Sequence, residues 1–463
     1  MADVLIKNGF IATMDRDANV HRRGNVYIRD DRIIAVGNTE TVKGTPDEVI
    51  DAENKVVMPG FVNTHSHLQQ YFRGLYEQIG EFYEVNLPME QYRQPEDMQY
   101  LAMASCAEFI HSGCTTSVVI YTYPDGFAEA VADSGMRAVL AVDIDEVDLE
   151  SLRQGSYEYV DAKGEAAFQR AVDLYNTWHG AEDGRITTLM APKAADLTRP
   201  EMYKRCKEFA DKNGLRVSTH LSQSSREYKQ VMSLYGKTPP QHLHDLGVLD
   251  EKLMAAHCVY ATEADLDLIR SAGNPILQCR FLHSPFVRWM DMGIPLALGT
   301  DDFYHDMLQL IRENLMGQSF RAGLLESAEQ MFGNDRVTSR PYLYEMLELA
   351  TRKGAEAIGM DKEIGSIEVG KKADLITIDL ENPFLLPTND PLTSVVLYGS
   401  SSDIDNVMID GKLVKRDSRF TTFNPKQAYA DAQKRVEEIR EKLFADHPHQ
   451  RDIWLRKIPY MKE

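Results

Sequence analysis

The sequence predicts an α/β protein that combines a (β/α)8 barrel of the TIM type with a small β domain formed from both chain ends. Strand-like and helix-like segments alternate through the middle of the chain, a pattern typical of parallel β/α units. Eight strand-like segments occur there, the number that closes such a barrel. Short strands and turns flank this middle part on both sides. With 463 residues the chain is long enough for one large and one smaller domain.

The two chain ends share the character of short strands joined by tight turns. Residues 25–37 contain two apolar runs around the turn Asp30-Asp31, and residues 407–414 contain an Asp410-Gly411 hairpin signal. The segment after residue 423 has the charged character of a helix followed by a polar tail, suited to packing or to contact between subunits. We therefore expect a β domain at 1–58 and 366–423, a barrel at 59–365, and a C-terminal helix and tail at 424–463.

Residues capable of metal or acid–base chemistry follow the predicted barrel strands. In a closed β/α barrel, catalytic residues lie at the carboxyl ends of the strands. We expect the eight strands at residues 55–63, 115–120, 137–142, 185–190, 216–219, 253–256, 275–278 and 294–298. The residues at their ends include His65, His67, Lys193, His220, His257 and Asp301.

The first barrel strand ends in two histidines, His65 and His67. Because side chains alternate along a strand, both imidazoles would face one side and can bind one metal ion. His220 and His257 each follow a later strand, and Asp301 follows the eighth. Three histidines and a carboxylate around a divalent ion leave a position for water, whose pKa the ion lowers from about 15.7 toward about 7. The pattern thus predicts a hydrolytic metal site.

Two further polar groups are expected to lie outside the chemistry. His242 and His244 form a second His-x-His pair, but residues 239–247 read as a helix start, where such positions diverge by about 200°. Asp143, Asp145 and Glu146 follow the third strand and could line the pocket, but a solvated loop is the preferred interpretation.

Composition argues against several kinds of partner. The formal net charge is −20, with acidic residues spread along the chain, which disfavours nucleic acid and anionic membranes. No apolar run is long enough for a membrane span, and the N-terminus lacks the features of a secretory signal. The five cysteines are scattered and form neither a disulfide framework nor a Cys-x-x-Cys pair. We expect a cytoplasmic protein with reduced thiols.

Six stretches of the chain, in order, carry a resemblance to known proteins: residues 59–67, 73–74, 112–116, 256–259, 298–301 and 364–375. The sequence resembles the amidohydrolase superfamily, in the branch of the triazine hydrolases and the methylthioadenosine/S-adenosylhomocysteine deaminases. The resemblance implies a (β/α)8 barrel with a β-sandwich domain from both termini. It also implies one divalent ion per subunit bound by His65, His67, His220 and Asp301, with His257 contacting the metal-bound water or the substrate. Zinc is the expected ion, with iron, cobalt or manganese as alternatives.

The chain departs from this branch at Gln223. Its relatives carry a glutamate three residues after the fifth-strand histidine and use it to shuttle a proton. Glutamine cannot carry that proton, although it can orient a substrate or water by hydrogen bonds. Glu227 lies one helical turn further on and could substitute for that glutamate, but the preferred interpretation is that it faces solvent or a neighbouring helix.

Two more departures concern Lys193 and the residues after Asp301. Many relatives have histidine at the end of the fourth strand, where this chain has Lys193. This lysine could polarise a carbonyl, be carboxylated between two metals, or remain solvated. The relatives usually have small polar residues after the eighth-strand aspartate. Here we expect the pocket to be lined by Asp302, Phe303 and His305.

These departures favour hydrolysis of an exocyclic C–N or C–S bond in a small uncharged urea, carbamate, thiocarbamate or amide. Such a reaction needs a Lewis acid or cation on the oxygen and a base for the water. Asp301 and His257 would move protons, while Lys193 and Gln223 orient the substrate. Phenylurea and thiocarbamate herbicide hydrolases are atypical superfamily members of this kind, which suggests xenobiotic degradation by a homo-oligomer.

The alternative is a deaminase or dechlorinase of a heteroaromatic ring such as a triazine, pyrimidine or purine. This chemistry needs a proton delivered to a ring nitrogen, the role of the missing glutamate. A catalytically dead relative serving as a binding protein is a third reading, and it predicts lost ligands. All of the expected ligands are present, so we expect an enzyme whose partners are a small-molecule substrate and water.

Overall fold

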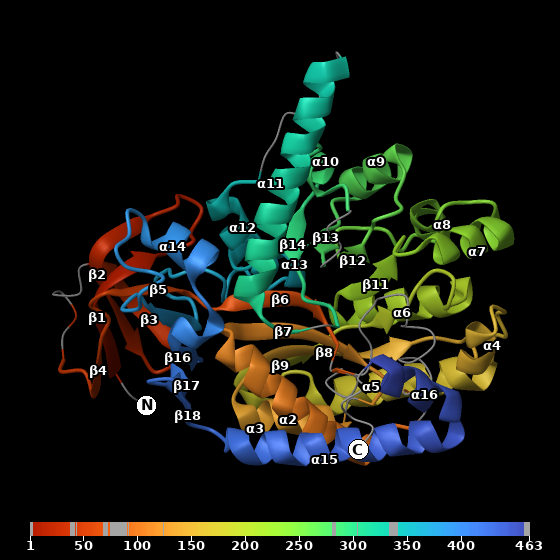
Figure 1. The fold of residues 1–463 in the computed structure, drawn as a ribbon, viewed down its shortest axis with the longest axis horizontal. Helices are drawn as coiled ribbons and strands as arrows, with labels where there is room; N and C mark the ends of the chain where they lie inside the picture. The colour runs from red at the N-terminus through yellow and green to blue at the C-terminus, as the bar shows by residue number, and fades with distance from the viewer. Residues whose placement is uncertain are drawn as a thin grey trace.

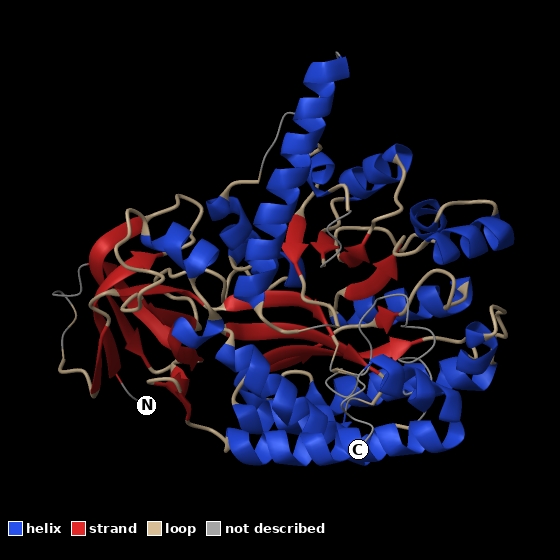
Figure 2. Cartoon of the chain, in the orientation of Figure 1, coloured by secondary structure: helices blue, strands red, loops and turns tan. Residues whose placement is uncertain are grey.

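The computed structural model describes residues 3–37, 42, 44–67, 73–74, 90, 92–123, 125–279, 284–302, 304–332 and 341–457. Strands from the two chain ends lie together on one side of the molecule, and a larger β/α body lies beside them (Figure 1). Helices cover the outside of the larger body, with strands at its centre (Figure 2). None of the described helices is long and apolar enough to cross a membrane.

The terminal sheet contains nine strands in the order β18-β17-β16-β15-β5-β1-β2-β3, with β4 paired to β1. The two chain ends meet where β5 and β15 pair in antiparallel fashion, with Val57 opposite Thr377. The strands are β1 (Asp3–Ala12), β2 (Val20–Arg29), β3 (Arg32–Gly37), β4 (Glu48–Asp51), β5 (Lys55–Pro59), β15 (Leu375–Asp379), β16 (Ile404–Ile409), β17 (Lys412–Arg416) and β18 (Arg419–Phe420). The expected turns at Asp30-Asp31 and Asp410-Gly411 join β2 to β3 and β16 to β17.

The larger body is an α/β barrel of the TIM type, as the sequence predicts. Its strands are all parallel and are β6 (Phe61–Ser66), β7 (Cys114–Tyr121), β8 (Arg137–Ile144), β9 (Ile186–Thr188), β10 (Ala191–Pro192), β11 (Val217–Leu221), β12 (Leu253–His257), β13 (Ile276–Gln278) and β14 (Leu296–Leu298). They form two sheets, and isolated parallel bridges link these sheets at both junctions. The bridges join Ser66 to Asp301, Met190 to Val217 and Ala194 to His220.

Helices surround the barrel and continue to the C-terminus. They are α2 (Pro95–His111), α3 (Asp125–Ser134), α4 (Leu149–Arg153), α5 (Asp161–Trp178), α6 (Pro200–Asn213), α7 (Ser225–Tyr235), α8 (Pro239–Asp245), α9 (Glu263–Ala272), α10 (Phe286–Asp291), α11 (Met307–Phe332), α12 (Leu343–Leu349), α13 (Arg352–Ile358), α14 (Pro391–Tyr398), α15 (Pro425–Asp446) and α16 (Pro448–Lys457). The outer end of α11 projects from the body, and α15 lies along α2 (Figure 1). After α15, the segment expected as a polar tail contains the second helix α16.

Because successive side chains of a barrel strand point to opposite faces, the strands contribute to an inner and an outer apolar core. Val139 and Ala141 of β8 belong to a compact apolar cluster with Val118, Ile120, Leu277 and Ala297 of the other strands. Leu140 and Val142 instead join the larger cluster that includes side chains of the surrounding helices. Residues of α13 complete the inner cluster and contact β6 and β14. The interior is thus filled with apolar side chains below the strand ends that carry the polar residues.

The expected first barrel strand at 55–63 is wrong in one respect, because it consists of two strands in different sheets. β5 belongs to the terminal sheet and β6 to the barrel, and the chain passes between them at Gly60. A Cβ atom on Gly60 would lie 2.1 Å from Cγ2 of Thr115. Only glycine fits this close approach without displacement of β7.

All five cysteines lie in the described part of the chain, where they are buried and free.

Candidate metal centre

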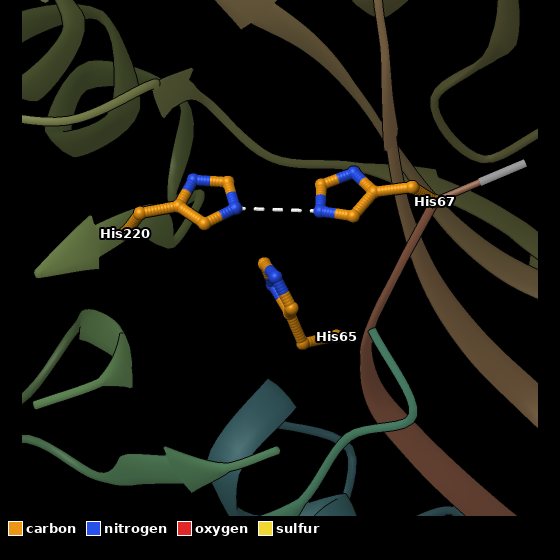
Figure 3. A group of neighbouring side chains, drawn as sticks. All are labelled: His65, His67 and His220. Carbon is orange, nitrogen blue, oxygen red and sulfur yellow. Dashed lines mark hydrogen bonds between the residues drawn. The ribbon is translucent and has the colours of Figure 1, made fainter. Parts of the chain in front are cut away.

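Four strand ends bring the expected ligands to one place at the mouth of the barrel, where His65, His67 and His220 face one another (Figure 3). His65 lies on β6 and His67 follows directly after it, His220 lies on β11, and His257 ends β12. Asp301 follows β14 and is bridged to Ser66. His257 and Asp301 have backbone φ angles of 77° and 58°, a left-handed conformation uncommon outside glycine. Such strained residues cluster at functional sites, and here they redirect the chain where two strands end.

The side-chain atoms have the spacing of a mononuclear metal site. The Nε2 atoms of His67 and His220 are 3.3 Å apart, and Oδ1 of Asp301 lies 3.5 Å from Nε2 of His67. Nε2 of His65 is 3.9 Å from the same oxygen. Ligand atoms held about 2.0–2.1 Å from a tetrahedral zinc ion lie about 3.4 Å from one another. The four groups therefore fit one divalent ion.

The hydrogen bonds of His67 and His220 orient their ring nitrogens. Nδ1 of His67 lies 3.0 Å from the carbonyl oxygen of Ile120, and Nδ1 of His220 lies 2.9 Å from that of Lys193. A carbonyl oxygen only accepts, so each Nδ1 carries the hydrogen and each Nε2 presents a lone pair. Burial, with the neighbouring His67, lowers the pKa of His220 to about 4, so its ring is neutral at neutral pH. Two lone pairs facing each other fit a cation between them.

His65 provides a second indication of a ligand. Its side chain is fully buried, and neither ring nitrogen makes a hydrogen bond to any residue that the structure describes. Burial lowers the pKa of His65 well below its ordinary value, so the ring is uncharged. A buried polar group without a hydrogen bond costs about 1–3 kcal/mol. A metal ion at this position would satisfy the nitrogen that faces Asp301.

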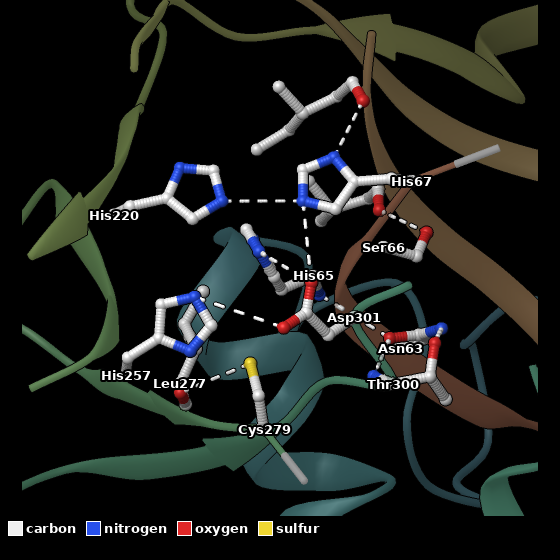
Figure 4. A network of polar contacts seen from close by, with 12 residues as sticks. Asn63, His65, Ser66, His67, His220, His257, Leu277, Cys279, Thr300 and Asp301 are labelled. Atoms are coloured by element: carbon white, nitrogen blue, oxygen red, sulfur yellow. Dashed lines mark hydrogen bonds and ion pairs between the residues drawn. The ribbon is translucent and has the colours of Figure 1, made fainter. Parts of the chain in front are cut away.

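A network between β6 and the end of β14 holds these ligands in place (Figure 4). Nδ2 of Asn63 donates to Oγ1 of Thr300 at 2.7 Å, and the amide N–H of Thr300 donates to Oδ1 of Asn63 at 3.0 Å. The amide of Asp301 donates to the carbonyl of His65 at 3.0 Å. The first and last barrel strands thus fix His65 and Asp301 relative to each other. His257 faces this pair, with Nε2 4.0 Å from Oδ2 of Asp301.

Lys193 forms a buried ion pair beside the centre. Its Nζ lies 3.0 Å from Oδ2 of Asp143 and 3.8 Å from Oδ2 of Asp145. The expectation of a solvated loop is wrong for both aspartates, whose side chains are only 10% and 11% exposed. Despite burial, the carboxylates of Asp143, Glu90 and Asp145 raise the pKa of Lys193, so its amine is a cation. Carboxylation of a lysine requires the neutral amine, and this environment stabilises the ammonium ion instead.

Gln223 follows β11 in a turn that Glu227 stabilises. The amide N–H groups of Ser222 and Gln223 donate to Oε1 and Oε2 of Glu227 at 2.9 and 2.7 Å. Glu227 is buried, so the interpretation that it faces solvent is wrong. Both of its oxygens bind backbone groups of this turn. Glu227 therefore supports the turn that carries Gln223.

The residues after Asp301 divide between the centre and the packing around it. Asp302 offers an oxygen within 4.8 Å of the ligand atoms of His67 and Asp301, and its buried Oδ1 has no hydrogen-bond partner among the described residues. His305 is instead stacked on Phe109 with ring centroids 4.1 Å apart, and the structure does not place it with the pocket residues. Phe303 lies outside the described residues.

Cys279 is a neighbour of the centre that the sequence reasoning missed. Its sulfur and one ring nitrogen each of His65 and His257 lie within 4.8 Å of one another (Figure 4). The spacing of the cysteines gave no signal for a site. Cys279 directly follows β13, however, and residues at the carboxyl ends of barrel strands are candidates for the site, so this rule would have identified it. The second His-x-His pair stays outside the centre as expected, since His242 stacks on Tyr235 and His244 is exposed.

Curated relatives match almost the whole chain. The 5'-deoxyadenosine deaminase of Methanosarcina acetivorans is 32% identical over 452 residues, which cover 95% of this chain and 99% of that protein. The 5-methylthioadenosine/S-adenosylhomocysteine deaminase of Caldanaerobacter subterraneus subsp. tengcongensis is 32% identical over 451 residues, which cover 94% and 98%.

Solved structures share the fold. An adenosine deaminase from Xanthomonas campestris with bound zinc has a TM-score of 0.82 at 24% identity and covers 95% of this chain and 99% of its own. The atrazine chlorohydrolase of Arthrobacter aurescens TC1 complexed with zinc has a TM-score of 0.82 at 20% identity, covering 94% and 100%. The amidohydrolase family itself matches residues 56–414. A chain matched over this length, with a histidine and aspartate cluster at its barrel mouth, belongs to the amidohydrolase family of metal-dependent hydrolases.

Proposed function

We propose that this protein is a metal-dependent deaminase that replaces the amino group of a heteroaromatic ring with oxygen and releases ammonia. The observation that carries this proposal is the match of nearly the whole chain to deaminases of adenosine-like compounds. It favours the alternative raised from the sequence over the hydrolysis of ureas, carbamates, thiocarbamates or amides. Only Gln223 and Lys193 favour those other substrates.

Each residue of the centre has a role in this reaction. A divalent ion held by His65, His67, His220 and Asp301 would act as a Lewis acid that activates water. We propose zinc, since the solved adenosine deaminase contains it. Oδ1 of Asp301 faces His65 and His67, whereas Oδ2 faces His257. We therefore assign Oδ2 of Asp301 as the oxygen that accepts a proton. Nε2 of His257 lies 4.0 Å from this oxygen.

Asp302 and Gln223 would bind the substrate. Oδ1 of Asp302 is buried beside the ligand atoms of His67 and Asp301 and makes no hydrogen bond within the described parts of the chain. An amino group on the ring would supply the missing donor. Gln223 stands at the position of the relatives' glutamate and can orient the ring by hydrogen bonds, although it cannot deliver a proton.

A panel of substrates tests the proposal. The metal-loaded protein is incubated with aminopyrimidines, aminotriazines and aminopurines, and separately with phenylureas, carbamates and thiocarbamates, and the products are identified by mass spectrometry. We expect amino-to-oxo exchange in at least one heteroaromatic amine, lost in Asp301→Asn. Cleavage of ureas or carbamates without any amino-to-oxo exchange would overturn the proposal.

A further inference from the structure

Asp143 and Lys193 form a polar edge inside the barrel mouth, which we call the Asp143–Lys193 edge. Val139 and Ala141 of β8 point into the inner core, and Asp143 is the next residue in this alternation. Leu189 and Ala191, on the neighbouring segment that includes β10, also point into the inner core. Lys193 is the next residue on that face. Both side chains therefore extend from the interior face of neighbouring strands.

The edge lies next to the metal centre. The carbonyl oxygen of Lys193 accepts hydrogen bonds from both the amide and Nδ1 of His220, at 3.0 and 2.9 Å. The following residue, Ala194, forms a parallel bridge with His220. A ring whose amino group reaches the metal centre would extend its other atoms along this edge.

The edge presents one donor and one acceptor side by side. Oδ2 of Asp143 lies 3.0 Å from Nζ of Lys193, but Oδ1 is buried and has no hydrogen-bond partner among the residues described. An ammonium group has three N–H donors, and Asp143 and Asp145 together engage at most two of them. The Lys193 side chain is 19% exposed, so the surrounding residues do not cover it completely.

Charge balance at this edge favours a neutral ligand. Lys193 would attract an anionic substrate, but the carboxylate of Asp143 would repel it. Glu90 also acts on Lys193, but Arg93 pairs with it at 3.5 Å and offsets its charge. A cationic guanidinium would satisfy Asp143 and meet Lys193 at close range. Asp145 adds little net charge, because Lys163 pairs with its second oxygen at 2.6 Å. The edge therefore suits a neutral group that accepts and donates at adjacent atoms.

We infer that the substrate is an amino heterocycle that also carries a lactam, with its carbonyl oxygen on Lys193 and its ring N–H on Oδ1 of Asp143. A lactam places an acceptor and a donor on neighbouring atoms and so satisfies both groups. An adenine-type ring has only bare nitrogens there and leaves Asp143 without a donor, at a cost of about 1–3 kcal/mol for a buried acceptor. The amino part of this inference rests on the proposed deaminase function, and the lactam part does not.

Matched pairs of amines test the inference by turnover. The pairs are isocytosine with 2-aminopyrimidine, ammeline with melamine, and guanine with 2-aminopurine, where only the first member carries a lactam. A site built to bind such groups rejects analogues that lack them by large factors. We expect kcat/KM to be at least about 100-fold higher for the lactam member of any pair that reacts. Equal values for both members would overturn the inference and leave deamination intact.

Variants locate the preference at the edge. The quantity compared is kcat/KM for the lactam member of a pair divided by kcat/KM for the member without a lactam. Lys193→Met is expected to reduce this ratio to below about 10, whereas Lys193→Gln keeps a neutral donor and should give an intermediate ratio. Lys163→Met is the matched control, because it removes the other cation on Asp145 and is expected to keep the full preference. Metal content and circular dichroism establish that each variant is folded. An unchanged ratio in folded Lys193→Met would contradict the assignment.

A binding measurement covers the case in which no amine reacts and the proposed function fails. Calorimetry compares uracil with 1,3-dimethyluracil, whose ring nitrogens carry no hydrogen, on the metal-loaded protein. Binding of uracil but not of 1,3-dimethyluracil would support lactam recognition at the Asp143–Lys193 edge without any turnover. The affinity for uracil should then be at least about 10-fold weaker in Lys193→Met. Equal binding of the two compounds, or no binding of uracil, would overturn it.

Discussion

Glu227 stabilises the turn that carries Gln223, and this role makes it a titrating group of the fold. Its two oxygens accept the amide N–H groups of Ser222 and Gln223, and Ser222 has a left-handed φ of 48°. Burial, together with the carboxylate of Asp196, raises the pKa of Glu227 to about 8. An unfolded glutamate titrates near about 4.3. Between these values the folded protein holds a proton that the unfolded chain releases.

Stability is therefore expected to fall as the pH rises through this window. The contribution of Glu227 is fully present below about pH 4.3 and is lost as the pH approaches about 8. Since one pKa unit corresponds to about 1.4 kcal/mol, a decline of a few kcal/mol is expected between about pH 5 and about pH 8. Urea denaturation at these values measures it. Glu227→Gln should show a smaller decline, and Glu208→Gln on the exposed side of α6 should behave like the parent protein. If the free energy of unfolding falls with pH equally in Glu227→Gln and in the parent protein, this assignment is contradicted.

At the scale of elements, Gly60 allows one continuous apolar run to serve two sheets. A Cβ atom there would meet Oγ1 and Cγ2 of Thr115 at 2.2 and 2.1 Å. We expect Gly60→Ala to lower the free energy of unfolding by about 1–3 kcal/mol through overpacking between β6 and β7. Thr115→Ala removes both of those atoms and should restore part of the loss. The double-mutant cycle, measured by chemical denaturation, checks the coupling. Additive effects of the two substitutions would show that the contact is not the cause.

The elements also show what the sequence can and cannot predict. Strand ends are predictable because apolar strands alternate with helices, and the strand-end rule correctly placed His65, His67, His220, His257 and Asp301 together. The boundary at Gly60 was missed, although the Pro59-Gly60 dipeptide inside the apolar run is a turn signal that could have marked it. The burial of Asp143 and Glu227 was also missed. Their partners, the ammonium of Lys193 and two backbone N–H groups, become neighbours only in the folded chain.

At the scale of the molecule, a buried ion-pair network joins the barrel to the terminal sheet. Arg137 at the start of β8 donates from Nε to Asp374 at 2.7 Å and also binds Asp410 beyond β16. The side chains of Arg137 and Asp374 are each 2% exposed. Removal of the guanidinium leaves two buried carboxylates without their cation. We expect Arg137→Ala to lower the free energy of unfolding by about 3–5 kcal/mol.

The control for this prediction is Arg288→Ala, which removes an exposed pair with Glu263. Because solvent screens that pair, its loss should change stability little. Both variants are compared by chemical denaturation with the metal-loaded parent protein. A loss for Arg137→Ala no larger than that for Arg288→Ala would show that the network does not hold the two parts together.

Dependence of activity on one bound metal ion is the most direct test of the account. The measurement follows metal content by elemental analysis and ammonia release from a reactive heteroaromatic amine in the same samples. We expect one divalent ion per chain, loss of activity on chelation, recovery with added zinc, and loss of both metal and activity in His67→Asn. The control His242→Asn removes a buried histidine outside the centre and should retain the metal. Ammonia release that persists in metal-free protein would contradict the account.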